Sequence, residues 1–517
     1  MTRRIAAAAA ALWLLWAGGA TAATVQVQGG AILGTVSADG AVSQYLGVPF
    51  AAPPVAGLRW RPPQPVAPWQ GVLETTHAAA ACPQPLPPPG SFYQNEFFRT
   101  SERQSEDCLY LNIWTPTAPL GHALPVMVWF YGGGFVQGSG SLASFDGAAL
   151  ARRGVVVVTI NYRLGPLGFL ALPELDRESP DHVSGNYGLL DMLAALRWVH
   201  GNIAGFGGDP DAVTVFGQSA GAMGVNAMIA APLAHGLFRR AIVESYPMFG
   251  MADPMQTLAQ AEAGGAAFAH AVGADSVADL RMVASTDLVR AMRGNAVGFG
   301  LRPNVDGHIL PQDMPAMIAG GGNAAALLIG VNYDEGTELL PPTTPAGLAA
   351  LARRRFAAEG AEVAARYSGA DADDATAAQD RMQSDYLLAA SAREAQVVAA
   401  QGIPAFVYRF VRLAPGSDPI KVGAFHSAEL VYVFGTQASV DRPWSARDRE
   451  LSDQMQQYWT NFAKTGDPNG DGLPTWPRFA PTGPTIMQLG DVTQPIAVLD
   501  PQRRTMFDTY LTTRLPQ

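Results

Sequence analysis

Cysteine, positive charge and long apolar runs are all scarce in this chain of 517 residues. It has only two cysteines, Cys82 and Cys108, and no histidine pair stands beside them, which excludes the usual patterns of a zinc site. Acidic residues outnumber basic ones, and the formal net charge is −10. Such a chain has no electrostatic reason to bind nucleic acid or an anionic membrane, so we expect neither as a partner.

Internal repeats and linkers rich in proline and serine are also missing, which argues against a repetitive or modular chain. Hydrophobic residues make up 48% of the sequence and charged residues 15%, as is typical of a globular protein with a large core. We therefore predict a single domain over residues 24–517. Beyond the N-terminus no segment has the roughly 20 consecutive apolar residues that span a bilayer, so no membrane anchor is expected.

Residues 1–23 have the pattern of a secretory signal peptide. Two arginines precede the apolar run 5–16, and small residues follow up to the expected cleavage after Ala22 or Ala23. We therefore predict a secreted or periplasmic protein. In an oxidising compartment the expected state of Cys82 and Cys108 is a disulfide, which would add roughly 3 kcal/mol of stability on the chain-entropy model.

Continuous apolar runs alternate with helical patterns through the middle of the chain. This alternation predicts an α/β fold with an open, mostly parallel sheet. Residues 25–50 are predicted to form antiparallel hairpins, and the alanine-rich segments 255–300 and 344–402 to form helices that cover the sheet edges or cap the site. The predicted strands are 109–114, 125–131, 155–162, 213–216, 240–244, 325–331 and 405–411, and the predicted helices are 147–153, 188–203 and 452–464.

The segment VTVFGQSAGA, residues 213–222, is central to the functional prediction. A short β-branched run leads at once into G-x-S-x-G and then into small residues of a predicted helix, which is the strand–turn–helix context of a nucleophile elbow. Glycines two positions either side of Ser219 avoid clashes in a strained turn, and the first amides of the helix point at the reacting group. A bare G-x-S-x-G often marks a plain turn, but these flanks favour a nucleophile.

A serine nucleophile needs a base, an acid that orients the base, and donors for the oxyanion. In the fold of this elbow the chain order is serine, acid, histidine. Of the histidines after Ser219, His426 follows a predicted strand in a loop and is favoured over His308, which lies in a turn; a solvated loop side chain is the alternative for each. Asp334 and Glu335 both follow a buried strand, and the pattern does not separate them.

Glycines at 132–134 directly follow the predicted strand 125–131. Consecutive glycines let backbone amides approach a developing negative charge, and one such donor contributes roughly 3 kcal/mol in the transition state. A phosphate-binding loop is excluded because neither G-K-[ST] nor G-x-G-x-x-G spacing accompanies the run. The segment is therefore predicted to form an oxyanion hole.

Together these motifs resemble the type-B carboxylesterase family, the cholinesterase-like branch of the α/β-hydrolases. The resemblance implies an α/β-hydrolase fold, with a large, mostly parallel central sheet flanked by helices, N-terminal hairpins and helical cap insertions. The matching segments are EDCLYLNIW (106–114), YGGGF (131–135), NYR (161–163), NIAGFGGDP (202–210), the elbow, DEG (334–336) and WTNFAK (459–464).

The resemblance also implies roles for individual residues. These are the nucleophile Ser219, the acid Glu335 rather than Asp334, the base His426, the oxyanion amides of Gly133, Gly134 and Ala220, and the family's first disulfide between Cys82 and Cys108.

Two positions depart from the family. Gln218 stands where the family usually has glutamate, and Phe98 stands where cholinesterases have a tryptophan for quaternary ammonium groups. Because both changes weaken the binding of a cation, they argue against choline esters.

The sequence therefore predicts a secreted serine carboxylic-ester hydrolase that acts on a small-molecule ester through a covalent acyl-enzyme, with no metal or organic cofactor. The alternatives are a cholinesterase-like enzyme or a specialised esterase for feruloyl, polyester or toxin side-chain esters. A non-catalytic adhesion or binding module is disfavoured because competent residues occupy all three triad positions. Activity is expected to fall below about pH 6–7 if the histidine has its ordinary pKa. The oligomeric state is left open.

Overall fold

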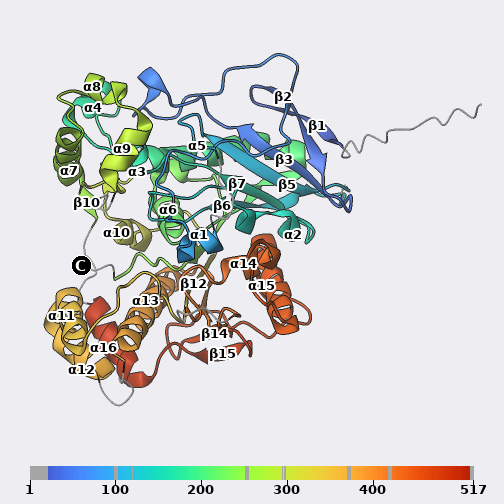
Figure 1. The fold of residues 1–517 in the computed structure, drawn as a ribbon. Coiled ribbons are helices and arrows are strands. Elements are labelled where there is room, and N and C mark those ends of the chain that lie inside the picture. The colour runs from blue at the N-terminus through green and yellow to red at the C-terminus, as the bar shows by residue number, and fades with distance from the viewer. Residues whose placement is uncertain are drawn as a thin grey trace, which may run out of the picture.

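The computed structural model describes residues 21–97, 103–118, 120–250, 255–293, 295, 299–368, 374–416 and 422–512. A twisted sheet runs through the molecule with helices on either side of it (Figure 1). Within the described residues this sheet has 13 strands. Their order is β1 (Thr21–Val27), β2 (Gly30–Val36), β3 (Val42–Pro49), β5 (Tyr110–Pro116), β7 (Val156–Ile160), β6 (Leu124–Phe130), β8 (Gly208–Gln218), β9 (Arg240–Glu244), β12 (Leu327–Asn332), β13 (Ala405–Phe410), β14 (Thr485–Leu489) and β15 (Gln494–Ala497), with β4 (Val72–Glu74) beside β2.

The strands from β7 to β14 are parallel. The pairs from β1 to β7 and the pair β14–β15 are antiparallel, and the short β4 lies parallel to β2. The sheet is therefore large and mostly parallel, with hairpins at its N-terminal edge, and the predicted fold class is confirmed. Because the carboxyl ends of parallel strands meet at one edge, the residues that follow β6, β8, β9 and β12 lie near one another.

Helices connect the parallel strands and cover the sheet. They are α1 (Phe92–Glu96), α2 (Ala148–Ala151), α3 (Gly165–Phe169), α4 (Pro173–Glu178), α5 (Tyr187–Asn202), α6 (Ala220–Ala230), α7 (Leu258–Ala271), α8 (Val277–Met282), α9 (Ser285–Met292), α10 (Met314–Ala319), α11 (Pro345–Phe356), α12 (Gly360–Ser368), α13 (Ala375–Ala400), α14 (Leu430–Val433), α15 (Ala446–Thr465) and α16 (Pro501–Thr512). None of the described helices combines the length and apolar character that crossing a membrane requires.

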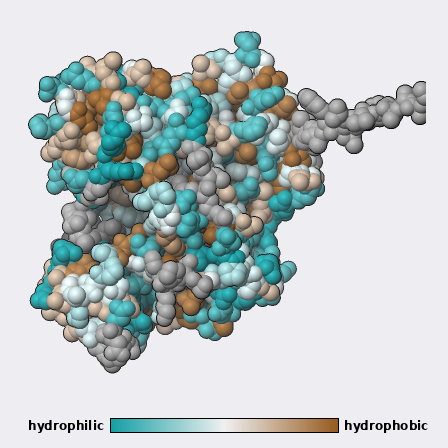
Figure 2. Space-filling view, in the orientation of Figure 1, coloured by the Kyte–Doolittle hydropathy of each residue, from teal (hydrophilic) through white to brown (hydrophobic). Residues whose placement is uncertain are grey.

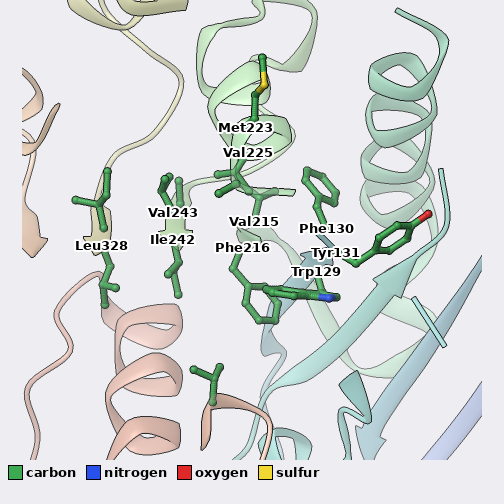
Figure 3. Close-up of a cluster of buried hydrophobic side chains, with 14 of the residues drawn as sticks. Trp129, Phe130, Tyr131, Val215, Phe216, Met223, Val225, Ile242, Val243 and Leu328 are labelled. Carbon is green, nitrogen blue, oxygen red and sulfur yellow. The ribbon is translucent and has the colours of Figure 1, made fainter. Parts of the chain in front are cut away.

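The central strands are buried on both faces, which explains their continuous apolar runs. Alternate side chains of one strand point to opposite faces. Figure 3 shows Phe130 and Val215 on the α6 side, whereas Trp129 and Phe216 point the other way, with ring centroids 4.8 Å apart. Each such side chain contributes roughly 1.5–3 kcal/mol by its burial, so this core fixes the ends of β6 and β8 firmly.

The two alanine-rich segments form helices, as predicted, but they pack differently. Helices α7 to α9 join α3 and α4 in a second hydrophobic cluster built around residues such as Leu170, Phe268 and Leu288. Helix α13 instead packs against β12 and β13. Both are interior strands, so this helix does not cover an edge of the sheet. Helix α1 lies within a segment for which no element was predicted, and strands β4, β14 and β15 were also missed.

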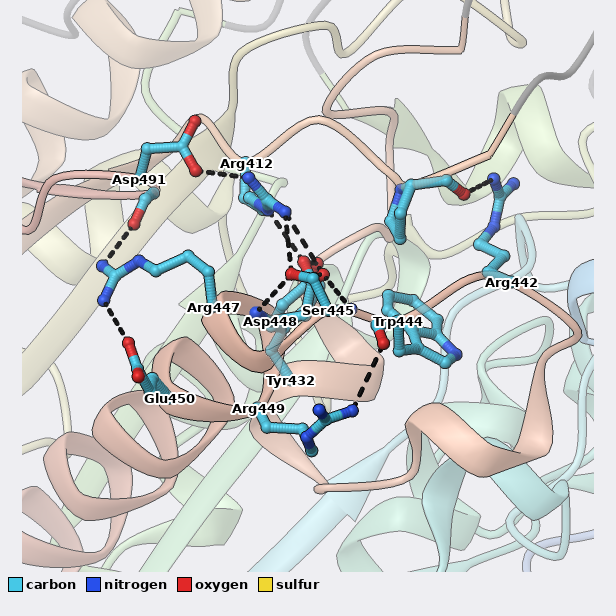
Figure 4. Close-up of polar contacts among 12 residues, drawn as sticks. Arg412, Tyr432, Arg442, Trp444, Ser445, Arg447, Asp448, Arg449, Glu450 and Asp491 are labelled. Atoms are coloured by element: carbon cyan, nitrogen blue, oxygen red, sulfur yellow. Dashed lines mark hydrogen bonds and ion pairs between the residues drawn. The ribbon is translucent and has the colours of Figure 1, made fainter.

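Helix α15 begins six residues before the predicted start because polar side chains hold its first turn. Ser445 accepts a hydrogen bond from Asp448 N, and Asp448 accepts one from Ser445 N in return. Arg412 also binds Asp448, as Figure 4 shows. Burial alone would raise the pKa of Asp448, but the Arg412 and Ser445 hydrogen bonds outweigh it and hold that pKa well below its usual range. Such a reciprocal cap stabilises a helix start that apolar periodicity does not reveal.

Near the N-terminus, Cys82 and Cys108 form the predicted disulfide. Strand β1 begins at Thr21, so the predicted signal peptide lies outside the described residues except for its last three.

On the visible face, hydrophilic and hydrophobic residues are interspersed (Figure 2), as is usual for a protein surface.

Candidate active site

Ser219 occupies the sharp turn between β8 and α6. Its φ of 56° and ψ of −125° lie in a region that L-residues rarely adopt. The turn is held from both sides, because Ser219 N donates to Glu244 O at 2.9 Å and Ser219 O accepts from Met223 N at 3.0 Å. This strained conformation is the one that the G-x-S-x-G pattern predicted.

The two flanking glycines allow the turn to pack against β6. A Cβ added to Gly221 would lie 1.9 Å from Phe130 O, and one added to Gly217 would lie 2.7 Å from the same oxygen. No side chain fits at either position. The backbone of α6 can therefore approach the end of β6 only because both residues are glycine.

The glycine run after β6 lies directly against the elbow. A Cβ on Gly132 would meet Gln218 Oε1 at 2.6 Å and Ser219 Cβ at 3.1 Å. Gly133 and Gly134 have φ values of 114° and 66°, which favour glycine. Among the described residues, no group accepts a hydrogen bond from the amides of Gly133, Gly134 or Ala220. Ala220 directly follows Ser219, and Gly133 lines one pocket together with Gln218.

His426 and Glu335 come from different loops and meet beside this turn. The imidazole Nδ1 lies 2.5 Å from Glu335 Oε2, and both side chains are buried. The neighbouring acid Asp334 has another contact: its carboxylate accepts a hydrogen bond from Ala424 N at 2.6 Å. The structure therefore places Glu335 against the imidazole and Asp334 against the backbone just before it.

The other ring nitrogen of His426 contacts Gln218, the residue just before Ser219. The sequence analysis considered Gln218 only as a position where the family usually has a negative charge. Gln218 Nε2 lies 3.0 Å from His426 Nε2. In the neutral imidazole, with Nδ1–H donating to Glu335, Nε2 carries the lone pair and accepts from the Gln218 amide. Glu335, His426 and Gln218 thus form one hydrogen-bonded row that ends next to Ser219.

Burial and charge act on His426 in opposite directions. Burial alone lowers its pKa, but the carboxylate of Glu335 outweighs burial, and the pKa of His426 rises from its ordinary value of 6.5 to about 9. The imidazole therefore becomes neutral only at a higher pH than the sequence led us to expect.

The sequence pattern that defines the Carboxylesterase family matches residues 21–506. The chain belongs to the carboxylesterase family. It is therefore a carboxylic ester hydrolase of the serine type.

Curated relatives of this carboxylesterase are esterases. It is 39% identical to fumonisin B1 esterase of Sphingopyxis macrogoltabida, over 90% of this chain and 85% of that protein. It is 36% identical to para-nitrobenzyl esterase of Bacillus subtilis (88% and 92%) and 34% identical to acetylcholinesterase of Bungarus fasciatus (89% and 80%). Among solved structures, a PNB esterase superposes with a TM-score of 0.81 at 34% identity, covering 94% of this chain and 99% of that one.

In this carboxylesterase a layer of buried polar groups holds the Glu335 side of the site. Glu335 Oε1 accepts from Asn332 N at 2.7 Å, and Glu335 N donates to Ser384 Oγ at 2.8 Å. Asn332 Nδ2 donates to Glu429, whose pKa burial raises to about 7. Sequence reasoning missed Asn332, Ser384 and Glu429, because no motif or spacing rule singles them out.

A small pocket of about 50 Å³ lies beside the elbow. Tyr93 and Phe97 form its aromatic wall, and their rings stack with centroids 6.2 Å apart. Both belong to the loop that the disulfide closes. The pocket is lined by Tyr93, Phe97, Gly132, Gly133, Gln137, Gly138, Leu142, Phe145, Gln218, Ser427 and Leu430.

Two further residues considered in the sequence lie elsewhere. His308, the alternative base, has its Nε2 3.6 Å from Asp181 and takes no part in the row around Ser219. Phe98, the position of the cholinesterase tryptophan, lies outside the described residues.

Proposed function

We propose that Ser219, His426 and Glu335 are the catalytic triad of this carboxylesterase, and that it hydrolyses small-molecule esters through a covalent acyl-enzyme. The observation that carries the proposal is the row from Glu335 through His426 to the strained turn at Ser219. His426 Nε2 takes the proton from Ser219 Oγ as the oxygen attacks the ester carbonyl. For this step Nε2 must exchange its Gln218 donor for the Ser219 hydroxyl.

The amides of Gly133, Gly134 and Ala220 are the proposed oxyanion donors. When Oγ bonds to the carbonyl carbon, the carbonyl electron pair moves onto oxygen, and these three N–H groups stabilise the negative charge. The tetrahedral intermediate then breaks its bond to the alcohol, which leaves with the proton from His426. Water then attacks the acyl carbon and gives its proton to His426. The bond to Ser219 Oγ breaks, His426 returns the proton to Oγ, and the acid leaves.

We propose that the substrate is not a choline ester. Gln218 supplies an amide where the family usually has a carboxylate, so the charge that would attract a quaternary ammonium group beside the serine is missing. The relatives are named for fumonisin B1, para-nitrobenzyl and acetylcholine esters, a range of substrates that the shared fold accommodates.

We also propose that the protein is secreted or periplasmic after removal of residues 1–23, and that residues 24–517 fold as one domain. The disulfide between Cys82 and Cys108 supports the first statement, because such bonds persist in oxidising compartments. The continuous sheet from β1 to β15 supports the second.

The triad is tested by replacing the nucleophile. Ser219→Ala should lower kcat for para-nitrophenyl acetate by about 10⁵-fold or more, while the thermal melt stays close to that of the wild type. Ser245→Ala is the matched control, since Ser245 also follows a strand and has a positive φ of 60°, and it is more deeply buried than Ser219; it should retain activity within about tenfold. Turnover by Ser219→Ala at the wild-type rate would refute the proposal.

A further inference from the structure

Helix α13 holds the turn that carries Glu335. Asp380 and Ser384 lie one helical turn apart on α13, so both can face the same neighbour. Gly336 N donates a hydrogen bond to Asp380 Oδ1 at 2.5 Å, and Glu335 N donates one to Ser384 Oγ at 2.8 Å. A Cβ on Gly336 would lie 2.9 Å from Asp380 Oδ1, so a larger residue would push the carboxyl group away. The helix therefore fixes two consecutive amides at the acid of the proposed triad.

On the other side of Glu335, Asp334 fixes the loop that carries His426. Asp334 Oδ2 accepts a hydrogen bond from Ala424 N at 2.6 Å, and Asp334 N donates one to Ala424 O at 3.1 Å. Gly423 has a φ of 61°, and a Cβ there would lie 2.1 Å from Asp334 Oδ2. The carboxyl group thus occupies space that only a glycine leaves free, and it joins the two loops two residues before His426.

The carboxyl groups of Asp334 and Asp380 are also hydrogen-bonded to each other. Two carboxylates can only accept hydrogen bonds, so this bond requires a proton on one of them. Burial raises the pKa of Asp380 to about 7, and the negative charges of Asp334 and Glu335 add to this effect, whereas the amide of Gly336 opposes it. We call Asp334 and Asp380 the carboxyl pair.

Charged groups on several elements face the carboxyl pair. Burial raises the pKa of Asp334 as well, and the hydrogen bonds just described oppose it, together with the charges of Arg409 on β13 and Arg381 on α13. Glu338, in the turn after β12, adds a negative charge within electrostatic range of Asp380. Because two ionised carboxyl groups in contact repel each other, the carboxyl pair is favoured with one proton and disfavoured with none.

We propose that Asp380 is a positioning residue: it shares one proton with Asp334 and thereby holds the turn of the acid against the loop of the base. The inference depends on the proposed function, because these two loops matter for catalysis only if Glu335 and His426 belong to the triad. None of the catalytic steps proposed above uses either member of the carboxyl pair.

The sign of the pH dependence follows from the raised pKa of Asp380. In the unfolded chain this carboxyl group ionises near its ordinary pKa of 3.8, whereas in the folded chain it keeps its proton up to about pH 7. The stabilisation by the shared proton is therefore complete below the lower value and is lost as the pH rises through the higher one. Loss of the proton breaks the bond within the carboxyl pair and loosens the connection between the two loops.

The test replaces the shared proton by an amide. In Asp380→Asn the side-chain oxygen can still accept from Gly336 N, and the NH₂ group donates to Asp334 at any pH. We measure kcat and KM for para-nitrophenyl acetate from pH 6 to 8.5, with the spontaneous rate subtracted. The ratio of kcat for this variant to that of the wild type should be about threefold higher at pH 8.5 than at pH 6. The change should appear in kcat and not in KM, because neither member of the carboxyl pair lines the pocket.

Melting temperatures provide a second measurement on the same samples. Asp380→Asn should melt a few degrees above the wild type at pH 8.5, and the difference should be smaller at pH 6. A residue that only fills space would give the same difference at both pH values.

Three further variants sharpen the comparison. Asp334→Asn supplies the amide from the other member of the carboxyl pair and should show the same rise of the kcat ratio with pH. Asp380→Ala removes both the acceptor and the donor, and should lower kcat about tenfold at both pH values. Asp508→Asn removes a carboxylate that is exposed on α16 and should follow the wild type throughout.

The inference is overturned if the kcat ratio of Asp380→Asn stays constant with pH, or if Asp380→Ala behaves like Asp380→Asn at both pH values. Should Asp380→Asn fail to fold, the same measurements on Asp334→Asn decide, and a constant ratio again refutes the inference. Full activity of Ser219→Ala would instead refute the proposed function, and the pH dependence of the melting temperatures would still test the shared proton. The two failures can therefore be distinguished.

Discussion

The two sides of the candidate site differ in the groups that they contribute. On one side, residues 130–138 and 217–224 place backbone groups: a strained serine, glycines without room for a Cβ, and unoccupied amides. On the other side, residues 332–338 and 424–429 place side chains: an imidazole, several buried carboxyl groups and the amide of Asn332. We call them the backbone side and the side-chain side.

This difference determines how each side responds to change. Backbone groups on the backbone side are fixed by steric exclusion, so any added side chain should disturb packing first and chemistry second. On the side-chain side, groups are fixed by hydrogen bonds and charge, so an isosteric substitution can leave the fold intact and still change reactivity.

The largest effect is expected on the side-chain side. Glu335→Gln keeps the shape of the side chain but removes the charge that orients His426 and stabilises its protonated form, so kcat should fall about 10⁴-fold. Asp334→Asn should cost at least a hundredfold less, because Asp334 contacts the backbone of Ala424. Steady-state kinetics with para-nitrophenyl acetate measure both variants. Equal losses would remove the distinction between the two acids.

The disulfide lies on neither side, so its loss should affect stability more than chemistry. The double variant Cys82→Ser with Cys108→Ser opens a loop with a sequence separation of 26 residues. Its free energy of unfolding should fall by about 3 kcal/mol, as measured by denaturant titration against the wild type. Since Tyr93 and Phe97 lie in this loop, KM should rise while kcat stays within about threefold. A large fall in kcat would mean that the loop also positions the catalytic groups.

A smaller loss of stability is expected from the backbone side. In Gly221→Ala the new Cβ would lie 1.9 Å from Phe130 O, and overpacking of this kind costs about 1–3 kcal/mol. Gly201→Ala makes the same change in α5, where nothing lies within 4 Å, and should leave stability unchanged or raise it slightly. Thermal melts of both variants measure the difference. Similar melting temperatures would show that the tight contact is not required.

The smallest effect is expected on the pH dependence, which reports how neighbouring carboxylates change the pKa of His426. Only the neutral imidazole can accept the serine proton, so activity should rise with pH through the pKa of His426. Because Glu335 raises that pKa, the half-maximal point of kcat/KM should lie above pH 6.5. Gln218→Glu adds a carboxylate beside Nε2 and should move this point upward by up to about one pH unit. A downward shift in the pH–rate profile would contradict the electrostatic argument.

Much of the backbone side was predictable from the sequence. Its geometry depends on residue types, such as glycine in a tight turn, that occur at these positions for one dominant physical reason. Gly217 and Gly221 mark a turn that excludes Cβ, and β-branched residues before them mark a buried strand. Strand β9, Arg240–Glu244, covers the same residues as its prediction, since a fully buried parallel strand is a continuous apolar run.

The side-chain side was less predictable. Sequence spacing did not separate Asp334 from Glu335; the distinction came from the family resemblance, and the contacts that differ are made with residues about 90 positions away. Glu338 and Glu429 depend in the same way on burial by distant elements. Polar residues in loops have no periodicity, so their partners become visible only when the chain is folded.

The central claim, that Ser219 is the nucleophile, is tested most directly by stoichiometric labelling. The protein is inactivated with a fluorophosphonate, and the modified peptide is identified by mass spectrometry. We expect one label per chain, on Ser219, in proportion to the activity lost, and no label on Ser219→Ala. Inactivation with the label on another residue, while Ser219 stays unmodified, would contradict it.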